Sequence, residues 1–304
     1  MVDLWVAALD ACAVTAERGA RPEGVVRLDA AEFSKVEVPK VRACVERVLM
    51  GAHPDLGLDM LLDVGALHAL LPEVHALVGF GDGEWRHKDV WKHTRQVVRQ
   101  AVPRTEVRWA ALLHDIGKVR TRRIEPNGEV HFFGHAEVGA SMFDRMHRRI
   151  PLFRGEEALS RSVRFLILHH LRASQYDASW TDSAVRRFAK EMGGCMNDLL
   201  DLSRADITTK RPERKRRGLE AISELAVRVR AIQALDAKVP PLPKGLGTEI
   251  FERFGVPPSP RMGELMRRLK DAVEGGELDA QREPDYYLSW LVDSGALGAT
   301  ASDS

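Results

Sequence analysis

The sequence predicts a mainly α-helical protein, and two observations carry this prediction. In nearly every segment, apolar residues recur at the three- and four-residue spacing of an amphipathic helix, whereas alternating, strand-like stretches are scarce. The chain has 304 residues, of which 44% are hydrophobic, so a sizeable core is available. This length predicts two or so compact units.

The helices are placed by their apolar stripes and by the proline and glycine residues at their ends. Pro39 begins one helix with its valines on a single stripe, and Gly117 is expected to end another. The N-terminal stretch MVDLWVAALDACAV is also predicted to be helical. The further predicted helices cover residues 39–50, 54–74 (two short helices separated at Gly65), 88–101, 105–116, 136–149, 156–171, 182–192, 196–209 and 215–236.

A small β-hairpin is predicted near residues 122–133, where a Pro-Asn-Gly turn separates two short alternating stretches. Two segments rich in glycine or proline, VGFGDGEWRHK and KVPPLPKGLG, predict domain boundaries. They divide the chain into an N-terminal helical module (1–85), a central domain (86–237) and a C-terminal tail (238–304). Two short helices around a Gly/Pro turn are expected in that tail.

Composition excludes several classes of protein. Lys and Arg (45) nearly balance Asp and Glu (44), so any basic surface must be local. The three cysteines show no zinc-binding spacing and fit a reducing compartment. The N-terminus lacks the basic start of a signal peptide, and no apolar run is long enough to span a membrane. We therefore expect a soluble cytoplasmic protein with no membrane partner.

Histidine and aspartate side chains lie on the apolar faces of five separate predicted helices. Burying one such group without a partner costs several kcal/mol, so burying six or seven points to a shared partner. Imidazole and carboxylate suit divalent Mn, Fe, Co, Ni or Zn, and one or two such ions are expected. Each residue taken alone also fits an ordinary core or surface position. The set consists of His93, His114, Asp115, His135, His169, His170 and Asp206.

These motifs resemble the HD superfamily of metal-dependent phosphohydrolases. KDVWKHT, ALLHDIGK, FFGHAEVGA, HHLR and RADI look like the HD region of bacterial tRNA nucleotidyltransferase and poly(A) polymerase proteins, and the likeness spans about residues 35–280. It implies a multi-helix HD domain between a neck-like module and a helical tail. No segment matches the nucleotidyltransferase head of those proteins, and too little chain precedes residue 35 to hold it. We therefore expect a protein that does not add nucleotides.

The resemblance also implies roles for the site residues. Asp115 would bridge two metals and so be catalytic, with a metal-bound hydroxide attacking phosphorus. His93, His114 and Asp206 would complete one metal site, and His135 with His169 or His170 the other. Both His169 and His170 flank apolar faces, so the choice between them stays open. Because the ligands must be neutral imidazole and ionised carboxylate, activity should fall as the pH drops through the histidine range.

Basic residues near this set are candidates for binding phosphate. Lys118 follows Asp115 by three residues and is also a candidate catalytic residue, with Arg120 and Arg122 close behind. Six of the nine residues in KRPERKRRG, 210–218, are Lys or Arg, and this segment and the C-terminal tail are candidate RNA or tRNA contacts. All of these charges also fit a solvated surface.

The function predicted on these grounds is hydrolysis of phosphoesters of nucleotides or RNA ends. The resemblance implies a 2′,3′-cyclic nucleotide phosphodiesterase with nucleotidase or phosphatase activity. One alternative is another HD hydrolase, either a dinucleoside polyphosphate hydrolase or a deoxynucleotidase. The other is an RNA-binding remnant without catalysis.

Overall fold

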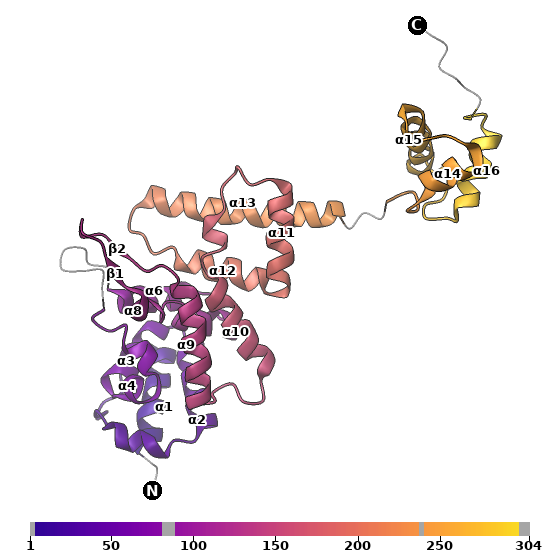
Figure 1. The fold of residues 1–304 in the computed structure, drawn as a ribbon. Coiled ribbons are helices and arrows are strands. Elements are labelled where there is room, and N and C mark those ends of the chain that lie inside the picture. Colours follow the sequence, from indigo (N-terminus) through magenta and orange to yellow (C-terminus); the bar gives the residue numbers. More distant parts are fainter. Residues whose placement is uncertain (1–3, 81–88, 237–239, 298–304) are drawn as a thin grey trace. The chain divides into compact units, whose positions relative to one another are not determined.

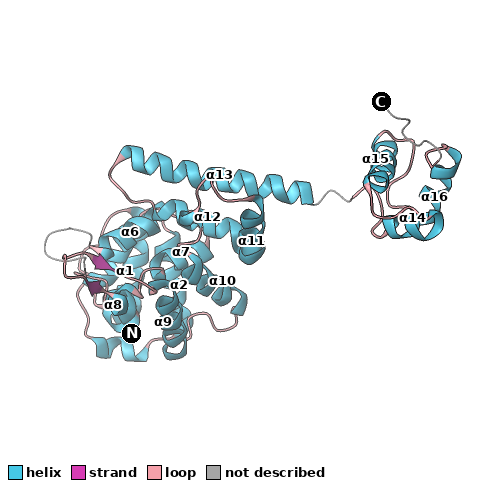
Figure 2. Cartoon of the chain, turned by 45° about the horizontal axis from the view of Figure 1, so that its top comes forward, coloured by secondary structure: helices cyan, strands magenta, loops and turns pink. Residues whose placement is uncertain are grey.

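The structure, a computed structural model, describes residues 4–80, 89–236 and 240–297. It confirms the mainly α-helical prediction, with a single small hairpin among the described residues (Figures 1 and 2). Its contacts divide the chain into one compact unit, Met1–Ile232, and a second, Gln233–Ser304. The boundary predicted at residue 85 lies outside the described residues. No described helix combines the length and the apolar composition that crossing a membrane requires.

The first unit contains the helices that carry the predicted site. They are α1 (Leu4–Arg18), η1 (Ala30–Lys35), α2 (Val38–Met50), α3 (Pro54–Asp63), α4 (Ala66–Leu70), α5 (Pro72–His75), α6 (Val90–Gln100), α7 (Thr105–Leu113), α8 (Lys118–Thr121), α9 (His135–Arg149), α10 (Glu157–His169), η2 (Ala173–Gln175), α11 (Asp182–Met192), η3 (Gly193–Cys195), α12 (Met196–Asp206) and α13 (Pro212–Asp236), the last belonging to this unit as far as Ile232.

Helix α7 is the central element of this unit. It packs against α2, α6, α10 and α12, and every residue from Val107 to Leu113 is buried. A helix that is buried on all sides needs apolar residues around its whole circumference, and α7 has them except at Arg108. The guanidinium of Arg108 donates hydrogen bonds to the carbonyls of Leu49, Gly51 and Ala101, which lie at the ends of α2 and α6. The first turn of α7 is thus bonded to the C-terminal ends of α2 and α6.

Helix α7 ends at Leu113, earlier than the apolar pattern predicts. His114 still donates its backbone N–H to Ala110, but Ile116 bonds to Leu113 and Lys118 to Asp115, three residues back in each case. Such tighter bonds are common where helices end. The chain therefore turns at the His114–Asp115 pair, and Gly117 precedes the short helix α8 rather than ending α7.

The predicted hairpin is present over a shorter range than residues 122–133. Strands β1 (Arg123–Ile124) and β2 (Val130–His131) pair antiparallel, with Arg123 opposite His131 and Ile124 opposite Val130. The turn between them contains Gly128 with φ of +78°, a backbone conformation that favours glycine. The hairpin joins α8 to α9 and so connects two parts of the predicted site.

The second unit has a separate core. It contains α14 (Leu246–Phe254), α15 (Pro260–Glu274) and α16 (Pro284–Asp293). Leu246, Ile250, Leu265, Tyr287 and Leu291 are fully buried in it. Helices α14 and α15 correspond to the two helices predicted around a Gly/Pro turn, whereas α16 has no counterpart in the sequence prediction.

Candidate metal centre

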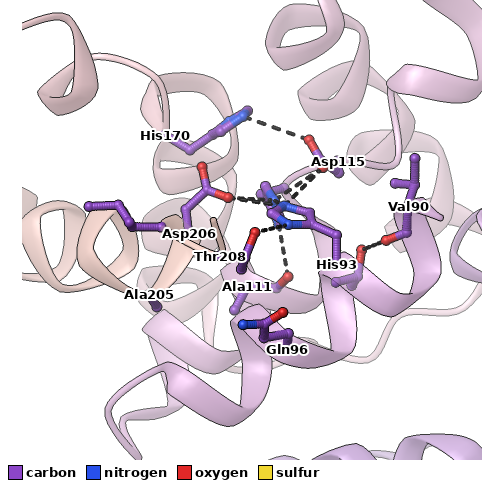
Figure 3. Close-up of polar contacts among 12 residues, drawn as sticks. Val90, His93, Gln96, Ala111, Asp115, His170, Ala205, Asp206 and Thr208 are labelled. Carbon is purple, nitrogen blue, oxygen red and sulfur yellow. Dashed lines mark hydrogen bonds and ion pairs between the residues drawn. The ribbon is translucent and has the colours of Figure 1, made fainter. Parts of the chain in front are cut away.

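Side chains from five helices or their ends converge where α7 terminates. Figure 3 shows His93, Asp206, Asp115 and His170 pointing toward one another. His93 comes from α6, Asp115 follows α7, His170 follows α10 and Asp206 ends α12. Residues up to 113 positions apart in sequence are therefore brought into one cluster by the packing of these helices around α7.

One side of the cluster is formed by His93, His114 and Asp206. Oδ1 of Asp206 lies 3.0 Å from Nε2 of His93 and 3.6 Å from Nε2 of His114. The two imidazole Nε2 atoms are 3.3 Å apart. Oδ2 of Asp115 faces the same histidines at 3.5 Å and 3.3 Å. The ligand atoms of His93, His114 and Asp115 lie within 4.8 Å of one another, and Oδ1 of Asp206 contacts both histidines.

The other side of the cluster is formed by His135 and His170. Their Nε2 atoms are 3.1 Å apart. Oδ1 of Asp115 lies 3.5 Å from Nε2 of His135 and 4.0 Å from Nε2 of His170. Asp115 therefore presents one carboxylate oxygen to each side, which is the arrangement of a carboxylate shared by two ligand groups.

Main-chain carbonyls determine which imidazole nitrogen faces the centre. Nδ1 of His114 contacts the carbonyl of Ala111, Nδ1 of His135 that of Phe132, and Nδ1 of His170 that of Ile167, at 2.7–2.9 Å. A carbonyl oxygen can only accept a hydrogen bond, so Nδ1 must be the donor. In a neutral ring Nε2 then carries no proton, and its lone pair is free to bind a cation. Metal-binding histidines typically have their second nitrogen held in this way.

These tautomers give a structural test of whether a cation fits the site. Two Nε2 lone pairs at 3.1 Å cannot hydrogen-bond to each other, so His135 and His170 require a proton or a metal between them. Oδ1 of Asp115 is buried and has no hydrogen-bond partner among the described residues. A divalent cation satisfies both deficits, and the nitrogen and carboxylate donors suit one. The residues present therefore fit a divalent metal.

The pKa shifts leave most of these groups in their metal-binding state. Burial lowers the pKa of His135 and brings that of His170 to about 4, so both rings are neutral at pH 7. Burial raises the pKa of Asp206, but the hydrogen bond from His93 and the nearby imidazoles outweigh it and lower the pKa to about 2. Burial likewise opposes ionisation of Asp115, yet His114 and Lys118 hold its pKa well below the usual range.

Gly117 lets the two sides of the cluster approach closely. A Cβ atom at this position would lie 2.0 Å from the carbonyl oxygen of His135 and 2.7 Å from the backbone nitrogen of Gly139. Both atoms are main chain and belong to α9, so a side chain at 117 would push this helix away. The absence of a Cβ thus allows Asp115 and His135 to lie in contact range.

Of the other predicted site residues, Lys118 is placed at the cluster and His169 is not. Nζ of Lys118 lies 2.6 Å from Oδ2 of Asp115. The ring of His169 packs against Phe165 with centroids 4.3 Å apart, so the geometry selects His170 for the cluster. Arg120 is exposed, and the guanidinium of Arg122 lies over the ring of Phe80 at 5.6 Å.

Two supporting contacts were not predicted from the sequence. Oγ1 of Thr208 lies 2.9 Å from Nδ1 of His93 and so occupies the nitrogen that faces away from the cluster. The amide of Gln100 donates to the carbonyl of Ala205, which fixes the end of α12 next to α6. Thr208 stands two residues after Asp206, and that proximity in sequence is the one signal that could have indicated it.

Comparison with known proteins identifies the relatives of this chain. An A-adding tRNA nucleotidyltransferase of Deinococcus radiodurans is 30% identical over 279 residues, which cover 88% of this chain and 62% of the relative. A CC-adding tRNA nucleotidyltransferase of Thermus thermophilus is 31% identical over 258 residues, covering 82% of this chain and 56% of the relative. This chain thus spans about three fifths of the length of these two relatives.

Other relatives are similar to a shorter part of this chain. A multifunctional CCA protein of Pasteurella multocida is 35% identical over 132 residues, 40% of this chain and 30% of the relative. The family model for the HD domain matches residues 87–238, half of the chain, and this range contains every residue of the cluster. The chain therefore belongs to the HD domain family, and its His/Asp cluster fits the metal-dependent phosphohydrolases of that family.

Proposed function

We propose that the protein hydrolyses 2′,3′-cyclic phosphates of nucleotides or RNA ends, with additional phosphomonoesterase activity. The observation that carries this proposal is Asp115, whose carboxylate faces two histidine pairs and has one buried oxygen with no hydrogen-bond partner in the part of the chain that the structure describes. This arrangement suits two divalent cations side by side. Paired cations are used for displacement at phosphorus because they stabilise both the attacking and the leaving oxygen.

The ligand roles follow from the two sides of the cluster. His93, His114 and Asp206 would hold one ion, His135 and His170 would hold the other, and Asp115 would be shared by both sites. A bound divalent ion supplies Lewis acidity toward phosphoryl oxygens and lowers the pKa of water. The ionised carboxylates and the neutral rings of His135 and His170 are the forms that such binding needs.

Lys118 holds a non-bridging phosphate oxygen in this proposal. Its ammonium lies against Asp115 and keeps about a fifth of its side chain exposed, so it can contact a ligand at the cluster. Arg120 and Arg122 add positive charge along the same segment and favour a phosphate there. In the reaction, water forms a new P–O bond, one ester P–O bond of the cyclic phosphate breaks, and the released sugar oxygen takes a proton.

A panel of phosphoesters tests this proposal. The protein, loaded separately with Mn, Co, Ni or Zn, is expected to hydrolyse 2′,3′-cyclic AMP fastest, with slower release of phosphate from 3′-AMP. Deoxynucleoside monophosphates and diadenosine tetraphosphate belong to the same panel. Faster turnover of either of these two would assign the chain to the alternative hydrolases, and no turnover with any loaded metal would overturn the proposal.

Contact with RNA is the second part of the proposal. All six basic residues of 210–218 are exposed, and within the described ranges only Arg216 among them forms ion pairs, with Glu213 and Glu220. The segment begins four residues after Asp206. The relatives are tRNA nucleotidyltransferases, which supports tRNA or another RNA as the partner of this segment and of the C-terminal tail.

Replacing Arg214 and Arg217 together by alanine should weaken RNA binding and its dependence on salt. Each lost phosphate contact reduces the slope of log K against log salt by about 0.7–0.9, so the double variant should lose about 1.5. Fluorescence anisotropy with a labelled tRNA measures this slope. A matched control replaces Arg145 and Arg148, two exposed arginines of α9, and equal loss in both variants would contradict a specific contact.

A further inference from the structure

We propose that His131 and Phe133, at the end of the hairpin, form a stacking platform for the nucleobase of the substrate. This inference rests on the proposed function, since it assigns the base-binding part of that site. The rings of His131 and Phe133 lie parallel, with centroids 5.0 Å apart and an interplanar angle of 12°. Phe133 is 71% exposed, the largest exposed fraction among the large apolar side chains of the described residues.

The platform is connected to the candidate metal centre by the main chain. Phe132 accepts a hydrogen bond from Nδ1 of His135, and Gly134, with φ of +73°, turns the chain directly into α9. Consecutive Cα atoms are 3.8 Å apart, so the Cα atoms of Phe133 and His135 are separated by at most about 7.6 Å. The exposed ring of Phe133 thus belongs to the residue two positions before a histidine of the cluster.

Cations lie near Phe132, the residue between the two rings of the platform, and they indicate which kind of ligand the segment takes. The ammonium of Lys118 lies 5.6 Å from the centroid of the Phe132 ring and also contacts Asp115. Phe132 in turn packs against Phe80, over which Arg122 lies. The segment around Phe132 therefore combines cations with flat apolar rings. A nucleotide matches both features, because its phosphate is anionic and its base stacks on aromatic side chains.

Among the described residues, the aromatic contact of the Phe133 ring is with His131. A phenylalanine that packs in a core loses most of its exposure, whereas this ring covers only one face of His131 and leaves the rest to solvent. The carboxylate of Glu129 lies 3.7 Å from Nε2 of His131 and helps to hold that ring in position. The pair is thus orientated before any ligand arrives.

Phe133→Ala should raise KM for 2′,3′-cyclic AMP by about 10-fold, because the variant loses the stacking of the base on an aromatic ring, while kcat stays within about twofold. The matched substrate is the 2′,3′-cyclic phosphate of methyl riboside, which has no base and should be hydrolysed equally well by both proteins. Phe133→Trp, which keeps an aromatic ring at this position, should have the KM of the wild-type protein. Ile124→Ala, which removes another exposed apolar side chain of the same hairpin, should change nothing.

Two results would overturn the platform. Equal losses with both substrates would show that Phe133 acts by positioning His135, and an unchanged KM would show that no base stacks there. If the wild-type protein hydrolyses neither substrate, the proposed function fails, and calorimetry with 3′-AMP and with methyl riboside 3′-phosphate still tests the platform. Preferential binding of 3′-AMP that is lost in Phe133→Ala would support it; no preference would exclude it.

Discussion

Replacing Asp115 with asparagine should remove metal from both sides of the cluster and reduce hydrolysis on the order of 10³-fold, the scale seen when one preorganised electrostatic group is removed. The amide has the same shape but no charge, and its nitrogen has no lone pair for a cation. Among the described residues, Asp115 is the group shared by the two His/Asp sets. A single substitution at this position therefore affects both ligand sets.

The measurement is metal content by mass spectrometry after dialysis, together with turnover of 2′,3′-cyclic AMP. We expect metal affinity to fall by at least about 100-fold, since loss of even a supporting contact costs 10–100-fold. Asp201→Asn is the matched control, because Asp201 is a partly buried acid of α12 that pairs with Arg104 and Arg204 instead. Full metal content and activity in Asp115→Asn would overturn the assignment.

Substituting alanine for Gly117 should be the most damaging change of a small residue in the first unit. The added Cβ would lie 2.0 Å from the carbonyl oxygen of His135, and a main-chain atom cannot rotate away. We expect the free energy of unfolding to fall by about 3 kcal/mol, at the upper end of the range for overpacking. Helix α9 must shift, so His135 also moves from Asp115 and metal affinity falls.

Urea denaturation measures the free energy of unfolding, and metal content after dialysis measures the loss of metal affinity. Gly194→Ala is the matched control, since a Cβ there meets no atom within 4 Å and Gly194 does not have positive φ. It should leave both quantities nearly unchanged. Equal stability of the two variants would show that α9 accommodates the methyl group without displacement.

The sequence is sufficient to predict where most of these helices lie and which side chains face inward. His93 and Asp206 each share a stripe with buried apolar residues, and these stripes alone place them toward the core. The end of α7 is different. Its apolar pattern continues through Ile116, which is buried, although α7 ends at Leu113 with His114 as its C-cap. The spacing of apolar residues indicates which positions are buried, and here the buried positions continue beyond the last residue of the helix.

The choice between His169 and His170 could not be made from the sequence either. The two rings are about 100° apart around a helix, and both positions border apolar residues. The selection depends on where α10 ends: His169 is its last residue, and His170 follows with its Nδ1 against Ile167. Such main-chain contacts, like that of Phe132 with His135, have no signature in residue types.

The three carbonyls that hold the imidazole rings have a consequence for which substitutions the site tolerates. Ala111, Phe132 and Ile167 each precede their histidine by three residues and contribute only backbone. Any side chain compatible with the local packing preserves the tautomer, because every residue type carries the same carbonyl. As proposed ligands, the histidines could not be exchanged, whereas residues of almost any type could supply the carbonyls that orient them. A sequence search that looks for the residue types of such a centre would therefore find the candidate ligands and miss the residues whose carbonyls orient them.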